Sequence, residues 1–368
     1  MGSQRRDDRR TDPGTSGGVS QAADPAAGPA VGIVANPLAG KDIRRLTSGA
    51  TPISDAVKIG AIRRAVVGAI EGGAERVLIS GDRARLGERA LAGWEVPGSV
   101  EVAEPHGWHT GRDSQLAAAQ FRDEGVGAIV ALGGDGTQRD VATGWREAPL
   151  VPLAVGTNNV FPIQTEATVA GFAAGAVASG HADAAEVTWQ AKIIDITTEG
   201  IQRAEMALVD VCLVRGAFVG ARAIWDLGSV SEIVAAIAEP DSVGLAAIAA
   251  AVAPVGRMES GGVHVGLGCA SANARDVQSC RHIRAAVMPG AYSDIDIAHC
   301  ERLRFGQPVT LSGPGVLTLD GEREIVLGRG ERADATVNPD GPYVIDVGAA
   351  VAAAQQRRYP FGSAVAGR

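Results

Sequence analysis

Residues 133–137, Gly-Gly-Asp-Gly-Thr, combine the residue types that phosphate chemistry needs. They follow a short apolar run, residues 127–132, which predicts a buried strand, and residues 138–145 can continue as a helix. Glycine lets the backbone approach a ligand closely, and the N–H groups of a helix's first turn are a natural seat for phosphate. The carboxylate of Asp135 could accept a proton from an attacking hydroxyl or hold a metal ion. The alternative is a plain strand-to-helix turn capped by Asp135, and this short pattern alone does not decide between them.

An earlier loop has a similar composition. Residues 31–35 predict a strand, and Asn-Pro-Leu-Ala-Gly-Lys follows it. This is not a Walker A loop, because Ala35 stands where that motif has its first glycine and Asp42 replaces its Ser or Thr. The loop could cup a nucleotide, with Asn36 hydrogen-bonding and Gly40 allowing close approach, or it could be an ordinary strand-to-helix turn.

The elements around these loops alternate between strands and helices. Apolar spacing predicts strands at 76–80, 99–103 and 150–155, and helices at 54–72, 113–121 and 166–179. This alternation predicts a parallel sheet with helices on both faces, and ligands of such sheets bind at the carboxyl ends of the strands. The strand at 150–155 ends in Gly156-Thr157-Asn158-Asn159. Three glycine- or amide-rich loops are therefore expected on one rim, which is a stronger signal than any one of them.

The second half of the chain has a different pattern. Short apolar segments separated by Gly, Pro and Asp predict a β-sandwich-like domain. Its expected strands are 187–197, 203–213, 262–267, 282–288, 294–297, 308–311, 316–319, 324–327 and 343–347. A helical segment at 231–252 interrupts the series, and 347–356 predicts a final helix.

Four regions are therefore predicted. Residues 1–29 are Arg-, Asp-, Gly- and Pro-rich without a hydrophobic pattern and are expected to be a disordered tail. Residues 30–183 form an α/β nucleotide-binding domain, 184–345 a β-sandwich substrate domain, and 346–368 a C-terminal helix and tail. A chain of 368 residues can hold about two domains.

Composition narrows the function classes. The net charge is −8 and only 4% of residues are aromatic, which argues against nucleic-acid binding. No apolar run reaches the ~18–20 residues of a membrane span, and the N-terminus has no apolar segment of a secretory signal. Four cysteines lie far apart without a Cys-x-x-Cys pair and are expected to be reduced thiols. A cytoplasmic protein is predicted.

The order of the motifs resembles the superfamily of NAD kinases and diacylglycerol or sphingosine lipid kinases. The matching pieces are Asn36-Pro-Leu-Ala-Gly40, Gly133-Gly-Asp-Gly-Thr137, Gly156-Thr-Asn-Asn159 and Leu319-Asp320-Gly321-Glu322. The amino-acid sequences of these motifs are most similar to those of the ATP-NAD kinase-like proteins of the acetoin catabolism protein X family. The resemblance spans about residues 31–350. It implies an α/β domain with a parallel sheet, followed by a β-sandwich, with the active site between them.

The resemblance also implies roles for residues. Asp135 would be the catalytic carboxylate, with Glu322 as a second acid–base or metal-linked group. ATP and Mg²⁺ would be the cofactors, with no single residue assigned to the metal. Asp210 and Asp320 would face the acceptor. The nucleotide would be held by Asn36, Gly40, Gly133, Gly134, Gly136, Thr137, Gly156, Thr157, Asn158 and Asn159.

Departures from the family pattern concern the acceptor. NAD kinases carry an Asn-Glu pair, which grips the dinucleotide, in a segment that is similar to residues 207–211. Here Val209 replaces the Asn and Asp210 the Glu. The loop at 156–159 is closer to the Gly-Thr-Gly-Asn-Asp of lipid kinases, but it ends in Asn159.

Three functions therefore compete. The first is an ATP-dependent kinase that phosphorylates NAD. The second is a kinase of another small alcohol or a lipid, and the third is a nucleotide-binding regulator without turnover.

His106 and His109 are expected in a surface or cleft-lining loop rather than a metal site, and Arg139 and Arg222 are candidate phosphate clamps. Relatives suggest a homo-oligomer.

Overall fold

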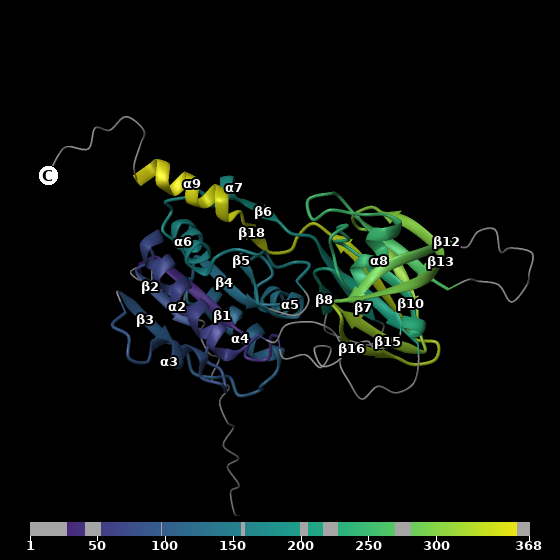
Figure 1. Cartoon of the computed structure of the whole chain (residues 1–368), viewed down its shortest axis with the longest axis horizontal. Coiled ribbons are helices and arrows are strands. Elements are labelled where there is room, and N and C mark those ends of the chain that lie inside the picture. The colour runs from purple at the N-terminus through teal and green to yellow at the C-terminus, as the bar shows by residue number, and fades with distance from the viewer. Residues whose placement is uncertain are drawn as a thin grey trace, which may run out of the picture.

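The chain folds into two lobes that lie side by side (Figure 1). The computed structural model describes residues 28–40, 53–96, 98–155, 159–198, 205–215, 227–268 and 281–358. The predicted tail up to residue 27, Lys41, Gly156, Thr157, Asn158, Arg222, Cys269 and Cys280 lie outside the described residues.

The first lobe is an α/β domain built on a seven-stranded sheet. All neighbours in this sheet are parallel except the last pair, which is antiparallel. The order is β3 (Ser99–Val102), β2 (Arg76–Ile79), β1 (Ala30–Ala35), β4 (Ala128–Gly133), β5 (Pro149–Ala154), β18 (Tyr343–Ile345) and β6 (Thr188–Gln190).

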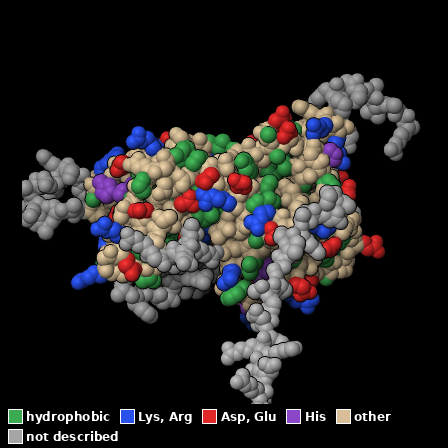
Figure 2. Space-filling model, turned by 180° about the vertical axis from the view of Figure 1, so that it is seen from behind, with side chains coloured by type: hydrophobic (Ala, Val, Ile, Leu, Met, Phe, Trp, Pro, Cys, Tyr) green, Lys and Arg blue, Asp and Glu red, His purple; other side chains and the backbone are tan. Residues whose placement is uncertain are grey.

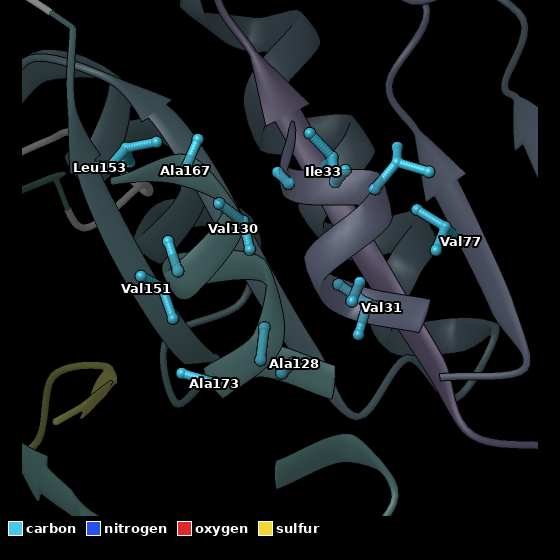
Figure 3. Packing of buried hydrophobic residues seen from close by; sticks show 14 of the residues in the cluster. Val31, Ile33, Val77, Ala128, Val130, Val151, Leu153, Ala167 and Ala173 are labelled. Carbon is cyan, nitrogen blue, oxygen red and sulfur yellow. The ribbon is translucent and has the colours of Figure 1, made fainter. Parts of the chain in front are cut away.

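Helices cover both faces of this sheet, as predicted. Strands β1 and β4 are buried at every position, which explains why they are apolar throughout rather than alternating. One face carries α2 (Asp55–Gly72), α3 (Leu86–Leu91), α6 (Ala167–Ala178), α7 (Ala184–Val187) and α9 (Val347–Arg358). The other face carries α4 (Gly111–Asp123) and α5 (Asp135–Gly144). Figure 3 shows valines of β1, β4 and β5 packed with alanines of α6.

Helices α2 and α6 pack backbone against backbone through glycines. A Cβ on Gly68 would lie 1.9 Å from the carbonyl oxygen of Thr168, and one on Gly171 would lie 2.1 Å from that of Ala65. Glycine is therefore required at these two positions, despite its usual cost in a helix interior.

The second lobe is a β-sandwich of two antiparallel sheets, which confirms the predicted class. The larger sheet has the order β12 (Arg281–Met288), β13 (Ala291–Leu303), β11 (Gly262–Leu267), β10 (Val230–Ala235), β9 (Asp210–Val214), β15 (Gly315–Leu319) and β16 (Glu322–Leu327). The smaller has the order β14 (Pro308–Ser312), β17 (Arg332–Asn338), β7 (Ile193–Thr198) and β8 (Glu205–Ala207). Apolar side chains of both sheets form one core, and α8 (Leu245–Val252) covers the outer face of the larger sheet. A short 3₁₀ turn, η1 (Leu227–Ser229), precedes β10.

The structure corrects three sequence expectations. Residues 230–235 form a strand, whereas the sequence predicted the start of a helix there. The prediction was wrong because an apolar run this short shows no periodicity that distinguishes a strand from a helix. Strands β6 and β18 belong to the α/β sheet, so the chain enters the sandwich after residue 190 and leaves it before residue 343. Helix α3 and strand β17 were not predicted, since α3 has only six residues and β17 alternates with small alanines.

Two of the four cysteines and one face of the surface can be described. In the described part of the chain, no helix is both long and apolar enough for a membrane crossing. Cys212 is a buried free thiol and Cys300 an exposed one. On the face seen in Figure 2, basic and acidic side chains of the described residues are interspersed.

Two glycine-to-alanine replacements in α2 test the packing with α6. We expect Gly68→Ala to lower the free energy of unfolding by about 1–3 kcal/mol, because the added Cβ overlaps a backbone atom of α6. Gly60→Ala is the matched control, since its Cβ meets only the end of the Arg64 side chain at 3.3 Å. It should gain about 0.5–1 kcal/mol from helix propensity. Urea unfolding of both variants measures the difference, and equal effects would contradict this packing.

Candidate active site

The loops after β1 and β4 meet because these strands are neighbours in the parallel sheet. The backbone N–H of Asn36 donates to the carbonyl oxygen of Leu132 at 3.4 Å. The Asn36 side-chain Nδ2 donates to Thr137 Oγ1 at 3.0 Å, and its Oδ1 accepts from the Leu38 N–H at 2.8 Å. Gly40 has φ 72°, in the region that favours glycine. Asn36 thus joins the first loop to the start of α5.

A buried lysine binds the backbone of the loop after β1. Lys58, on α2, has no exposed surface, and its Nζ donates to the carbonyl oxygens of Asn36 at 3.1 Å and Pro37 at 2.8 Å. This role was not predicted, because the partners are more than twenty residues away and a lysine on a helix usually faces water.

Asp135 connects the start of α5 to the chain that follows β5. Its side chain is 4% exposed, and Oδ1 accepts from the backbone N–H groups of Val160 at 3.0 Å and Phe161 at 2.8 Å. These bonds fix the position of the carboxylate. Asn159, half-buried, immediately precedes Val160. Asn159 and Val160, which follow residues 156–158, therefore lie at the same rim.

Two glycines of the second loop allow close contacts. A Cβ on Gly133 would lie 2.2 Å from that of Thr137, so the strand could not turn into α5 as it does. A Cβ on Gly136 would lie 3.0 Å from Glu322 Oε1. Glu322, in β16 of the sandwich, thus lies against the first turn of α5 in the α/β domain.

Arg139 links α5 to the turn that carries Glu322. Its guanidinium is buried, donates from Nη1 to the Leu319 carbonyl oxygen at 2.7 Å, and lies 3.5 Å from Glu322 Oε2. The Arg139 nitrogen nearest Glu322 is Nη2, and Asp140 Oδ1 lies 3.8 Å from it. The sequence suggested Arg139 as a phosphate clamp, and that role stays a prediction. Its contacts in the structure hold the β15–β16 turn against α5.

Asp320 is part of this turn, and its N–H donates to the carbonyl oxygen of Asp210 in β9 at 3.0 Å. Asp320 has φ 51° and accepts through Oδ1 from the backbone N–H groups of Val209 at 2.8 Å and Leu208 at 3.1 Å. Burial raises the Asp320 pKa, against the opposing charge of Arg139. Asp210 is 5% exposed, and together with burial it raises the pKa of the Cys212 thiol. Both carboxylates are covered by protein, and their contact with an acceptor stays a prediction.

Among the described residues, two cavities are considered at this rim, and the larger has a volume of about 450 Å³. It lies at the carboxyl ends of β1 and β2 and at the start of α4. Its walls include Asn36, Leu38, Asp82, His109 and Ser114. His109, predicted in a surface or cleft-lining loop, has φ 55°, and its N–H donates to Asp113 at 2.7 Å. Within the described ranges, no group of three His, Cys, Asp or Glu side chains could hold a metal ion.

The smaller cavity, about 280 Å³, lies between the two domains. Asn159 and Val160 contribute one wall and the sandwich the other, with six polar side chains among the lining residues: Asn159, Gln164, Glu239, Asp241, Ser242 and Arg257. Arg257 donates to the Val160 carbonyl oxygen at 3.0 Å and to Glu239 Oε2 at 2.7 Å, which lowers the Glu239 pKa. This pair was not predicted, because neither residue lies in a recognisable motif.

Two family models divide the chain in the same way as the structure. The model described as the ATP-NAD kinase N-terminal domain matches residues 31–181, and the one described as the acetoin catabolism protein X C-terminal domain matches residues 192–340. The first lobe is thus a domain of the NAD kinase type, joined to a β-sandwich. Acetoin catabolism protein X of Cupriavidus necator is 33% identical over 328 residues, which cover 86% of this chain and 90% of that protein. The chain belongs to the acetoin catabolism protein X family.

Two solved structures resemble the chain at low sequence identity. Yeast NADH kinase complexed with NADH is 11% identical with a TM-score of 0.48, covering 92% of this chain and 89% of that one. A putative diacylglycerol kinase from Bacillus anthracis is 10% identical with a TM-score of 0.40, covering 87% and 98%.

The structural role of Asp135 can be separated from any chemical one by two variants. Asp135→Ala leaves two buried N–H groups without this acceptor, so we expect the free energy of unfolding to fall by about 2–4 kcal/mol. Asp135→Asn keeps a carbonyl oxygen in place and should cost about 1 kcal/mol or less. Urea unfolding of both variants measures this. Equal losses would show that the bonds to Val160 and Phe161 contribute little.

Proposed function

We propose that the chain transfers the γ-phosphoryl group of ATP to a hydroxyl group. The observation that carries this proposal is the meeting of three parts at the first turn of α5. They are Asn36 bound to Thr137, Asp135 bound to the chain after β5, and Glu322 against Gly136. Phosphoryl transfer depends on positioned backbone donors, a metal ion and a carboxylate more than on a covalent nucleophile.

The phosphates of ATP would lie at the start of α5. This ten-residue helix offers the partial positive charge of its first turn, and the side chain of Thr137 stands there with Asn36. The first two predicted loops supply residues for this end of the nucleotide, and Gly156, Thr157 and Asn158 would approach it from the third.

The donor groups present suit Mg²⁺, which prefers carboxylate and phosphate oxygens. Glu322 would hold the ion together with the phosphates, since its side chain is 38% exposed and lies over the helix start. Bound there, Mg²⁺ would neutralise charge on the phosphoryl oxygens. Arg139 would keep Glu322 in place, because it grips the turn that carries it.

Asp135 would take the proton of the attacking hydroxyl. A general base must be held in position, and the N–H groups of Val160 and Phe161 would hold this carboxylate. NAD kinase activity is the form of this reaction that the family resemblance implies.

A second acceptor is favoured by the residue at position 209. Where NAD kinases have the Asn that grips the dinucleotide, Val209 is 1% exposed and belongs to the same apolar cluster as Val160 and Phe161. The interdomain cavity is small and polar, which suits a small hydroxyl compound better than an acyl chain. Acetoin, after which the Cupriavidus necator relative is named, carries such a hydroxyl. Self-association and a cytoplasmic location stay predictions.

Labelled ATP and a panel of acceptors test the class of reaction. The panel contains NAD, diacylglycerol, acetoin and 2,3-butanediol, each incubated with the full chain and Mg²⁺. We expect transfer to one of the two small alcohols. Transfer to NAD alone would establish NAD as the acceptor instead, and ATP binding without transfer to any of the four would favour a regulator.

A variant of the interdomain cavity tests where the alcohol binds. Ser242→Leu adds bulk to this 280 Å³ cavity. It should raise KM for the alcohol about tenfold while the Kd for ATP is unchanged.

Asp135→Asn tests the catalytic carboxylate. We expect phosphoryl transfer to fall at least about a hundredfold, the usual contribution of a general base. ATP affinity should stay within about tenfold, or roughly 1.4 kcal/mol. Asp123→Asn is the matched control, because Asp123 is an exposed partner of Arg122 at the end of α4. Normal turnover of the Asp135 variant would disprove the assignment.

A further inference from the structure

The larger cavity lies beside the proposed phosphate site but away from the sandwich. All of its lining residues come from the α/β domain, and Asn36 belongs both to its wall and to the contact with Thr137. Its volume of about 450 Å³ is within the usual range for small-molecule sites. A nucleotide whose phosphates lie at the start of α5 could thus extend its nucleoside into this cavity.

One buried carboxylate in the cavity wall is only partly used by the fold. Asp82 is 6% exposed, and its Oδ2 accepts from the Leu86 N–H at 3.0 Å. Its Oδ1 has no hydrogen-bond partner. Burial raises the Asp82 pKa, although the backbone N–H groups of Leu86, Ala84 and Arg85 oppose this. A buried carboxylate oxygen without a donor is costly, so a ligand that supplies donors would offset the cost.

The position of Asp82 indicates which donors these are. It follows β2, directly beside β1, in a parallel sheet whose loops are proposed to bind a nucleotide. An acidic residue beyond the first strand–helix unit of such sheets commonly accepts the hydroxyls of a ribose. The end of β2 is held firmly against β1, because Ser80 Oγ accepts from the Ala35 N–H at 3.2 Å.

We propose that the larger cavity binds the nucleoside of the phosphoryl donor and that Asp82 accepts hydrogen bonds from its ribose hydroxyls. This inference rests on the proposed function, since it takes the nucleotide to be bound at this rim. It adds a specificity residue that no motif contains. Arg83 also lines the cavity, so a nucleotide with a 2′-phosphate is the rival ligand.

The competing explanation is that Asp82 serves only the fold. Its bond to Leu86 stabilises the start of α3, a helix of six residues. Asp82→Asn separates the two roles, because an amide oxygen can still accept from the Leu86 N–H while the charge is lost. A structural role would weaken every nucleotide equally, whereas a ribose contact would weaken only those that carry the hydroxyl.

The experiment is calorimetric titration of the full chain with ADP, 2′-deoxy-ADP and 3′-deoxy-ADP. In the unchanged protein we expect at least one deoxy analogue to bind about ten- to a hundredfold more weakly than ADP, the size of a hydrogen bond to a charged group. In Asp82→Asn and Asp82→Ala, ADP should weaken to the level of that analogue, and the discrimination should disappear. Asp123→Asn is the control and should keep it. Urea unfolding shows whether each variant is folded.

Three results would overturn the inference. They are equal binding of all three nucleotides by the unchanged protein, an equal loss for all three in Asp82→Asn, and tighter binding of adenosine 2′,5′-bisphosphate than of ADP. The first two leave the kinase proposal standing if phosphoryl transfer is observed. Conversely, Asp82-dependent discrimination without transfer to any acceptor would support this inference and disprove the kinase. No binding of any adenine nucleotide would end both.

Discussion

The bonds from Val160 and Phe161 to Asp135 hold the parts of the site together. Asp135 lies at the first position of α5, where the helix dipole favours a negative charge, and it accepts both N–H groups in a buried setting. The exits of β4 and β5 therefore cannot move independently. Asn36 is attached to the same helix turn through Thr137, and Glu322 lies on it across Gly136.

Helix α5 and the residues after it also fix the two domains relative to each other. Arg139 binds the β15–β16 turn, and Arg146 forms a bidentate pair with Asp195 of β7, with both distances 2.9 Å. The hydrogen bonds to Asp195 raise the Arg146 pKa. Bidentate geometry is specific as well as strong. Both links therefore resist a change in the relative orientation of the two domains.

Most of the α/β domain could be predicted, because its strands are apolar throughout and its helices are long enough to show their period. The same rules could not place residues 230–235, or show that β6 and β18 join the first sheet, since pairing partners are set by contacts far apart in sequence. Local motifs indicated Asn36 and Asp135. Lys58, Asp82 and Arg257 lie at the site because segments far apart in sequence meet in the fold. Their positions in the sequence follow no motif, so they could not be predicted from it.

The segment at 207–211 shows how a chain with an NAD kinase type of domain can differ from NAD kinases in the acceptor that it would bind. In NAD kinases the matching residues grip a dinucleotide, but here Val209 is part of the core. The N–H groups of Leu208 and Val209 are bound by Asp320, so the backbone of the segment is also committed to the sandwich. A dinucleotide would have to displace these contacts, which carry the cost of unpaired buried groups. An acceptor that enters through the polar cavity around Arg257 and Glu239 meets no such cost, because that cavity already exists between the domains.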